Sequence, residues 1–141
     1  MVDPAKLDQL LGNLRRYRDV LTALGEVPEK QFLADPDKIG NAKYHFVIAI
    51  ECAIDVANHV IASEGYRFPQ DNADCFSVLA SEGIVPSELE PSLRAMARFR
   101  NRLVHLYRDV DDRRVYEYLQ TGLADLDRFA RAVVDRFLRR D

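Results

Sequence analysis

Residues 46–61 read FVIAIECAIDVANHVI, and this stretch decides the fold that the sequence adopts. Its polar residues Glu51, Asp55 and His59 are spaced by four, so on a helix they form one narrow strip. Apolar side chains cover most of the remaining circumference. A helix of this kind lies at the centre of a bundle, or is shared between a core and a partner. We predict such a helix over residues 37–64, ended by Gly65.

The rest of the chain also has helical spacing. The further helices predicted from apolar periodicity cover approximately residues 4–24, 28–33, 72–81, 89–107 and 113–139. Asp3 and Pro4 suit the start of the first, and Gly25 suits its end. No alternating strand pattern and no internal repeat is present. The predicted fold is therefore all-α, an antiparallel up-and-down helical bundle that forms a single domain over residues 1–141.

Composition agrees with a folded globular protein of one domain. The 141 residues are 48% hydrophobic and 30% charged, which argues against a disordered chain. The start, Met1–Pro4, has neither the basic region nor the apolar run of a signal peptide. The apolar stretch 46–62 carries charged residues and is too short and polar to span a bilayer. We therefore expect a cytoplasmic protein with no membrane partner.

Several classes of site are disfavoured because their motifs are missing. Every glycine is isolated, so the sequence has no phosphate-binding loop. Cys52 and Cys75 share no motif spacing, and no His-Glu-x-x-His or Glu-x-x-His repeat occurs. The serines lie in no nucleophile elbow. The expectation is a protein that needs no metal and no cofactor.

Charge is distributed unevenly along the chain. The formal net charge is −3, yet the segment 94–108 contains five arginines and no acidic residue. The other residues hold 15 basic and 23 acidic side chains. Arginine forms forked contacts to phosphate, so this one segment is a candidate for binding nucleic acid.

Arg100 interrupts the apolar stripe of the helix predicted over 89–107. On a helical wheel it lies in the middle of the side formed by leucines, Met96, Val104 and Tyr107. A buried arginine needs a carboxylate or other acceptors, and Glu51 and Asp55 are the natural candidates. A structural ion pair, or an arginine whose stem packs while its head reaches water, would explain the same pattern.

The run from Arg100 to Tyr107, RNRLVHLY, resembles the R-x4-H-x-Y signature of the HEPN superfamily. It is most similar to HepT-like toxins, which are encoded beside a minimal nucleotidyltransferase (MNT) antitoxin. Asn101 fits because a polar residue often follows the arginine in that family. Residues 53–59 resemble the family's central helix, and Val115-Tyr116 after an acidic turn resembles the entry to its last helix. The resemblance covers residues 40–130.

The resemblance implies a metal-independent endoribonuclease toxin of a type VII toxin–antitoxin system, with its site at a homodimer interface. Cleavage by the RNA's own 2'-hydroxyl needs a base, an acid and positive charge on the crowded phosphate. His105 can serve as base or acid, since imidazole titrates near neutral pH. Arg100 can grip two phosphate oxygens, and Asn101 can orient the imidazole or donate to the phosphate. A two-fold dimer would supply both proton-transfer groups.

The same resemblance assigns roles to residues around this pair. Tyr107 is the position that the partner nucleotidyltransferase adenylylates in HepT-like proteins, although a core aromatic with its hydroxyl at the rim would also fit. AMP there would compete with RNA by charge and by size. Glu51 and Asp55 are expected to support the site. The arginines expected to contact RNA are Arg94, Arg98, Arg102 and Arg108.

A second interpretation stays open from the sequence. The chain could be a non-catalytic dimeric helical module that binds a nucleotidyltransferase or a nucleotide, with Arg100 as a structural ion. Contacts made only by arginines to phosphates carry little base information, so tRNA and mRNA are both possible substrates.

Overall fold

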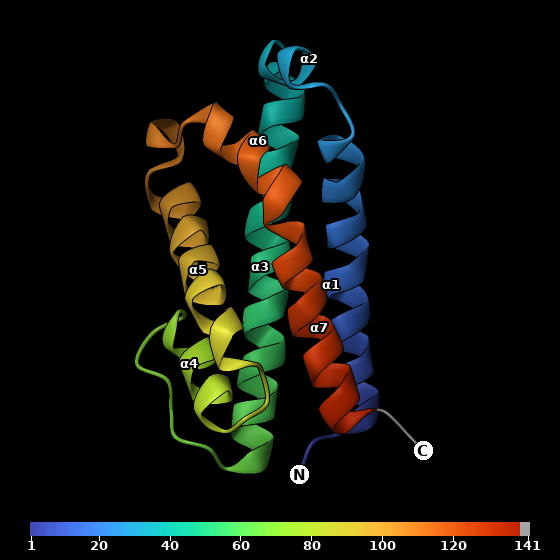
Figure 1. Cartoon of the computed structure of the whole chain (residues 1–141), viewed down its shortest axis with the longest axis vertical. Coiled ribbons are helices and arrows are strands. Elements are labelled where there is room, and N and C mark those ends of the chain that lie inside the picture. Colours follow the sequence, from blue (N-terminus) through green and yellow to red (C-terminus); the bar gives the residue numbers. More distant parts are fainter. Residues whose placement is uncertain (139–141) are drawn as a thin grey trace.

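The computed structural model describes residues 1–138, and within them every regular element is helical. The seven α-helices are α1 Pro4–Gly25, α2 Glu29–Leu33, α3 Pro36–Glu64, α4 Asp74–Ser81, α5 Glu90–His105, α6 Asp112–Thr121 and α7 Leu123–Phe137. Two short 3-10 turns, Ser87–Leu89 and Tyr107–Asp109, flank α5. The chain runs up along α1, down along α3, up along α5 and down through α6 and α7 (Figure 1). This confirms the predicted all-α up-and-down order.

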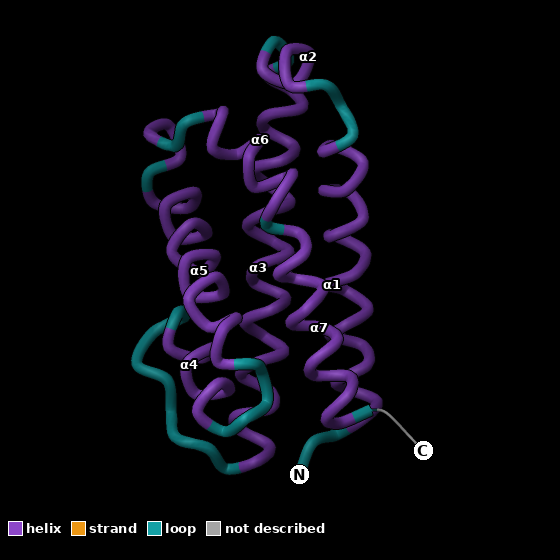
Figure 2. Tube along the Cα trace, viewed as in Figure 1, coloured by secondary structure: helices purple, strands orange, loops and turns teal. Residues whose placement is uncertain are grey.

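Helix α3 is the central element, as its sequence predicts. It lies between α1 and α5 along its length and contacts α4 near its end (Figure 2). Asp35 caps its start, because its side chain accepts hydrogen bonds from the backbone N–H groups of Asp37 and Lys38. Gly65 ends it at a φ of 71°, a left-handed conformation that favours glycine.

The length of α3 corrects one expectation. By length and composition α3 is long and apolar enough to cross a membrane, so the expectation that its apolar stretch, residues 46–62, is too short and polar to do so is wrong. Half of its most apolar window is buried inside the fold, which is what a central core helix requires.

A cluster of aromatic rings joins α3, α5 and α6. Phe99 of α5 stacks on Tyr118 of α6 with ring centroids 4.2 Å apart. Phe46 of α3 meets Phe99 edge to face at 5.5 Å and Tyr118 at 6.0 Å. Phe46 and Phe99 are buried, so the cluster fixes the position of α5 on α3 close to Arg100.

The helix predicted over residues 113–139 is in fact two helices, α6 and α7, which meet at Gly122. Arg139 lies outside the described residues. Gly122 has an ordinary φ of −79°, so its backbone is open to any residue. The constraint is space, because a Cβ at Gly122 would lie 2.6 Å from Cδ1 of Tyr118. The ring of Tyr118 occupies this position because it stacks on Phe99.

We predict that Gly122→Ala lowers the free energy of unfolding by about 1–3 kcal/mol, since the added methyl group must displace a packed ring. Gly12→Ala is the matched control, because Gly12 is a solvent-exposed residue in the middle of α1 with nothing within 4 Å of its Cβ position. In that control the free energy of unfolding should rise by about 0.5–1 kcal/mol, because alanine has a higher helix propensity than glycine. Urea unfolding measures both, and equal stabilisation by the two changes would contradict the packing account.

The helix predicted over residues 89–107 also differs from α5 at both ends. Ser87 and Glu90 have capping-box spacing, but neither the 3-10 turn nor α5 has a side-chain cap hydrogen bond. Residues 87–89 instead form the 3-10 turn, which moves the start of α5 to Glu90. At the other end α5 stops at His105, because Leu106 leaves the helical conformation at φ −130°. Tyr107 therefore lies in a separate turn.

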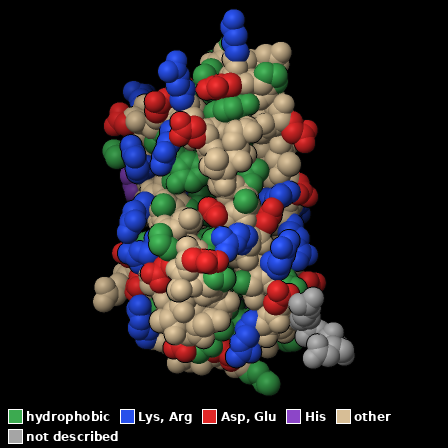
Figure 3. All heavy atoms as spheres, viewed as in Figure 1, with side chains coloured by type: hydrophobic (Ala, Val, Ile, Leu, Met, Phe, Trp, Pro, Cys, Tyr) green, Lys and Arg blue, Asp and Glu red, His purple; other side chains and the backbone are tan. Residues whose placement is uncertain are grey.

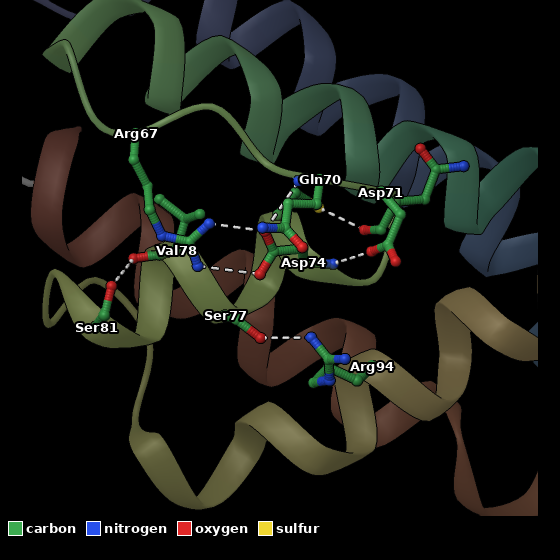
Figure 4. A network of polar contacts seen from close by, with 10 residues as sticks. Arg67, Gln70, Asp71, Asp74, Ser77, Val78, Ser81 and Arg94 are labelled. Carbon is green, nitrogen blue, oxygen red and sulfur yellow. Dashed lines mark hydrogen bonds and ion pairs between the residues drawn. The ribbon is translucent and has the colours of Figure 1, made fainter.

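The loop before α4 is organised by one carboxylate. Arg67 donates to both oxygens of Asp74, at 2.7 and 3.0 Å, and the backbone N–H of Gln70 donates to Oδ2 at 2.9 Å (Figure 4). These hydrogen bonds, first the one from Arg67, lower the pKa of Asp74 from 3.8 to about 2. Asp71 in turn accepts from the backbone N–H of Asp74.

We predict that Asp74→Asn costs about 1–2 kcal/mol of unfolding free energy at pH 7. A carboxyl group with a lowered pKa in the folded state stabilises the fold above its unfolded pKa. The difference between variant and wild type should therefore shrink as the pH falls from 4 towards 2. Asp8→Asn, at an exposed site of α1, is the control and should show no such trend in pH-dependent urea unfolding.

Candidate functional site

The side chain of Arg100 lies on the buried face of α5, and α3 supplies its partner. Nη2 of Arg100 donates to Oε1 of Glu51 at 2.5 Å, and Nη1 donates to Oδ1 of Asn101 at 3.0 Å. The neighbours Met96 and Leu103, one turn away on either side, are buried. The prediction that a carboxylate of the central helix meets this arginine is confirmed, and the carboxylate is that of Glu51.

The ion pair stands at the edge of the core. The side chain of Arg100 is 19% exposed and that of Glu51 is 43% exposed. Nε of Arg100 is buried and has no hydrogen-bond partner within residues 1–138. The stem of the arginine is thus held in the fold while its Nη atoms lie where an anion could compete with Glu51 for them.

Asp55 lies one turn beyond Glu51 on α3 and is exposed. Its pKa is raised, first by partial burial of the carboxyl group and then by the negative charge of Glu51. No described hydrogen bond joins Asp55 to Arg100. The structure therefore distinguishes the two acids, since Glu51 pairs with Arg100 whereas Asp55 lies close to Glu51 and Lys6.

His105 is the last residue of α5 and is exposed, and its imidazole has no hydrogen-bond partner in the described part of the chain. The backbone N–H that follows it, from Leu106, bonds to the carbonyl oxygen of Arg102 at 2.7 Å. Asn101 was expected to orient the imidazole or to contact phosphate. Its Oδ1 is engaged by Arg100, which leaves its amide nitrogen to donate.

Apolar side chains at the end of α5 and in the turn after it are exposed to solvent. Val104 and Tyr107 were predicted on the stripe that faces the core, but they are 44% and 48% exposed. They are exposed because the packing on α5 ends with Leu103 and the helix stops two residues later. Leu106 and Tyr44 are also exposed, at 50% and 61%. Val104, Leu106 and Tyr107 are close together in the sequence, and apolar side chains that are exposed as a group are typical of an interaction surface.

The four arginines predicted to contact RNA have different surroundings. Arg98, Arg102 and Arg108 are exposed and form no ion pair within residues 1–138. Lys and Arg side chains gather along the edge of the molecule that overlies α5 (Figure 3). Arg94 is half-buried and donates to Oγ of Ser77 on α4 at 2.6 Å (Figure 4). Its role in binding RNA stays a prediction, as do those of the other three.

Sequence reasoning missed Lys43, the one buried charged residue in the described part of the chain, at 5% exposure. Nζ of Lys43 donates to the carbonyl oxygen of Tyr107 at 3.2 Å and lies 3.3 Å from Oδ1 of Asp112. The sequence signal for its burial was its spacing, because Lys43 precedes the buried residues Phe46 and Ile50 by three and seven positions. That spacing places it on the buried face of α3.

No group of three or more His, Cys, Asp or Glu side chains within residues 1–138 could hold a metal ion. The side chains with candidate chemistry are the guanidinium of Arg100 with its partner carboxylate Glu51 from the middle of α3, and the imidazole of His105 at the end of α5.

A family model described as ribonuclease HepT-like matches residues 10–133. The chain belongs to the HepT-like family. Two relatives are named nucleases. The chain is 32% identical over 79 residues to the mRNA nuclease HepT of Shewanella oneidensis, covering 56% of this chain and 59% of that protein. It is 22% identical over 132 residues to the tRNA nuclease HepT of Aphanizomenon flos-aquae, covering 94% and 90%.

Solved structures share the fold of this HepT-like chain. A tri-AMPylated Shewanella oneidensis HEPN toxin in complex with its MNT antitoxin superposes with a TM-score of 0.86 at 23% identity, covering 96% of this chain and 99% of that one. YutE of Bacillus subtilis, described as a cytosolic protein of unknown function, gives a TM-score of 0.80 at 19% identity, covering 99% and 96%. At these identities the likeness shows the HEPN fold.

We predict that Arg100→Met changes the free energy of unfolding by less than about 1 kcal/mol, because the Glu51 carboxylate left behind is partly exposed and can be hydrated. Phe99→Ala, at the adjacent buried position, should cost about 3–5 kcal/mol and shows that the assay detects core damage. A loss of about 3 kcal/mol or more for Arg100→Met would mark the arginine as a structural ion.

Proposed function

We propose that this chain is a HepT-like endoribonuclease toxin of the HEPN/MNT type, acting in the cytoplasm without a metal ion or cofactor. The observation that carries the proposal is the setting of Arg100. Its guanidinium is held at the surface by Glu51 and Asn101, five residues before the exposed imidazole of His105 on the same helix. A phosphate-binding cation and a proton-transfer group are the two functions that metal-free RNA cleavage requires.

In the proposed reaction the 2'-hydroxyl oxygen of RNA attacks the adjacent phosphorus atom, and the bond to the 5'-oxygen breaks. One imidazole removes the hydroxyl proton while a protonated imidazole supplies a proton to the leaving oxygen. Arg100 binds the non-bridging oxygens, and to do so it must share or leave the carboxylate of Glu51. The products are a 2',3'-cyclic phosphate and a free 5'-hydroxyl.

A second copy of the chain completes this site. One chain supplies one His105, whereas the reaction needs both a base and an acid. The exposed apolar side chains of Val104, Leu106 and Tyr107, which flank His105 in the sequence, support a homodimer, because a two-fold contact there would cover them and bring two imidazoles together. The half-exposed outer face of α3 supports the same arrangement.

The acids and arginines around the pair have supporting roles in the proposal. Glu51 keeps Arg100 extended before RNA arrives, and Asp55 adds a second carboxyl group one turn away. Arg98, Arg102 and Arg108 are free to bind phosphates beyond the scissile one. Arg94 would have to leave Ser77 to join them.

Neutralisation is proposed to occur by adenylylation of Tyr107 by an MNT-type nucleotidyltransferase antitoxin. The related Shewanella oneidensis toxin is AMPylated and in complex with such an antitoxin. The phenol of Tyr107 is half-exposed in the turn after His105. An AMP group there would add negative charge and bulk beside the RNA site.

We predict that His105→Ala and Arg100→Ala each slow RNA cleavage by about 100-fold or more, because one removes proton transfer and the other removes charge stabilisation. Cleavage of a labelled RNA measures this, with helicity and dimerisation checked for each variant. Two controls should keep wild-type activity. His45→Ala removes a second imidazole, and Arg128→Ala removes the arginine of another Arg–Glu pair, with Glu88 at 2.9 Å.

The same assay decides between the toxin and the non-catalytic module. The Arg100–Glu51 ion pair is the contact that favours the module, since it gives the arginine a structural role. Equal and weak cleavage by the wild type and all variants would indicate a contaminating nuclease. That outcome would contradict the toxin and favour a dimeric module that binds a nucleotidyltransferase or nucleotide.

We predict that incubation with the cognate nucleotidyltransferase and ATP adds AMP to Tyr107 and abolishes RNA cleavage. Peptide mass spectrometry locates the modification. Tyr44→Phe, which removes the other exposed tyrosine of this surface, should still be modified at Tyr107, whereas Tyr107→Phe should not. An unmodified Tyr107 peptide would reject neutralisation by this route.

A further inference from the structure

Lys43 contacts the turn that carries Tyr107 at both of its ends. At the first end, Nζ donates to the carbonyl oxygen of Tyr107 at 3.2 Å. At the second end, Nζ lies 3.3 Å from Oδ1 of Asp112, the first residue of α6. Between them the same ammonium lies 4.4 Å from the centroid of the Tyr107 ring. One buried cation thus makes three kinds of contact with a segment of six residues.

These contacts explain how the charged ammonium group of Lys43 can be buried. A lysine is seldom fully buried unless it is paired, because the charge loses its hydration. The carboxylate of Asp112, the backbone carbonyl and the face of the phenol ring replace that hydration together. Removing the lysine would leave the turn with fewer contacts to α3, since Tyr107, Arg108 and Asp109 are exposed and only Val110 is buried.

The contacts also fix how the phenol is presented. The ammonium on one face of the ring and the backbone bond at the same residue restrict both the ring and its main chain. The hydroxyl lies against α3 at Gly40, where an added Cβ would be 3.7 Å from the oxygen. The hydroxyl therefore lies close to the backbone of α3, while the Tyr107 residue as a whole is 48% exposed. These contacts restrict the orientation of the ring.

We infer that Lys43 is a positioning residue for modification of Tyr107, which clips the 107–112 turn onto α3 and orients the phenol as an acceptor of AMP. This inference rests on the proposed neutralisation. In the step, the Tyr107 oxygen attacks the α-phosphorus of ATP and the bond to the bridging oxygen breaks. Pyrophosphate leaves, and the phenol proton passes to a base of the nucleotidyltransferase or to water. Lys43 takes no part in the bond changes.

The test compares Lys43→Met and Lys43→Arg in the full chain, with Lys30→Met at an exposed site of α2 as the control. The initial rate of AMP transfer to Tyr107 is followed by intact mass at varied ATP concentrations. We expect Lys43→Met to lower the maximal rate by about tenfold or more, because a mobile acceptor is seldom aligned for attack. The KM for ATP and the rate of RNA cleavage should be unchanged. Lys43→Arg should restore most of the rate, since a guanidinium can contact both the carbonyl and the ring.

Asp112→Asn provides a second test of the inference if the Lys43→Met variant does not fold. It removes the charge partner but keeps the lysine, and should slow AMP transfer to a smaller extent. AMP transfer to the Lys43→Met variant at the wild-type rate would overturn the inference about Lys43 and leave the proposed neutralisation intact. Loss of RNA cleavage in step with AMP transfer would also overturn it, because it would show general damage to the fold. A wild-type chain that accepts no AMP would instead reject the proposed neutralisation, and the inference with it.

Discussion

The packing of α5 against α3 is the interaction on which the rest of the structure depends. Phe46 and Phe99 meet edge to face in the core, and Tyr118 stacks on Phe99 to bring α6 to the same place. This contact fixes the distance between the two helices where they carry their charged residues. The Arg100–Glu51 ion pair lies at the rim of that contact, so its geometry is set by the aromatic core beneath it.

Two cation contacts link the same pair of helices to different parts of the candidate site. Arg100 of α5 reaches across to Glu51 of α3, and Lys43 of α3 reaches across to the turn after α5. The first holds the guanidinium that we propose binds phosphate, and the second holds the tyrosine in the turn after His105. In a half-exposed ion pair, the arginine can exchange its carboxylate partner for a substrate anion. A buried lysine cannot move in this way, because its charge would lose the contacts that replace hydration.

The apolar surface at the end of α5 connects the fold with assembly. Val104 and Leu106 would belong to the core if the helix continued beneath another element, but α5 ends and α6 turns away. The same end carries the imidazole. These exposed apolar side chains beside His105 are the feature on which the proposed homodimer rests, since a second subunit would bury them and bring a second imidazole to the site.

The sequence by itself determined the helical class, the central position of α3 and the residues of the candidate pair. Hydrophobic periodicity and capping residues such as Asp3 act locally along the chain, so they can be read without coordinates. Only the tertiary structure decided that Glu51, and not Asp55, meets Arg100. It alone revealed the break between α6 and α7 at Gly122, and the ring of Tyr118 that fills the space where a Cβ at Gly122 would lie. The spacing of Lys43 places it on the buried face of α3, but only the structure showed that its partner is the carbonyl oxygen of Tyr107, 64 residues away. Contacts between distant segments depend on how helices pack, and side-chain spacing within one helix does not encode them.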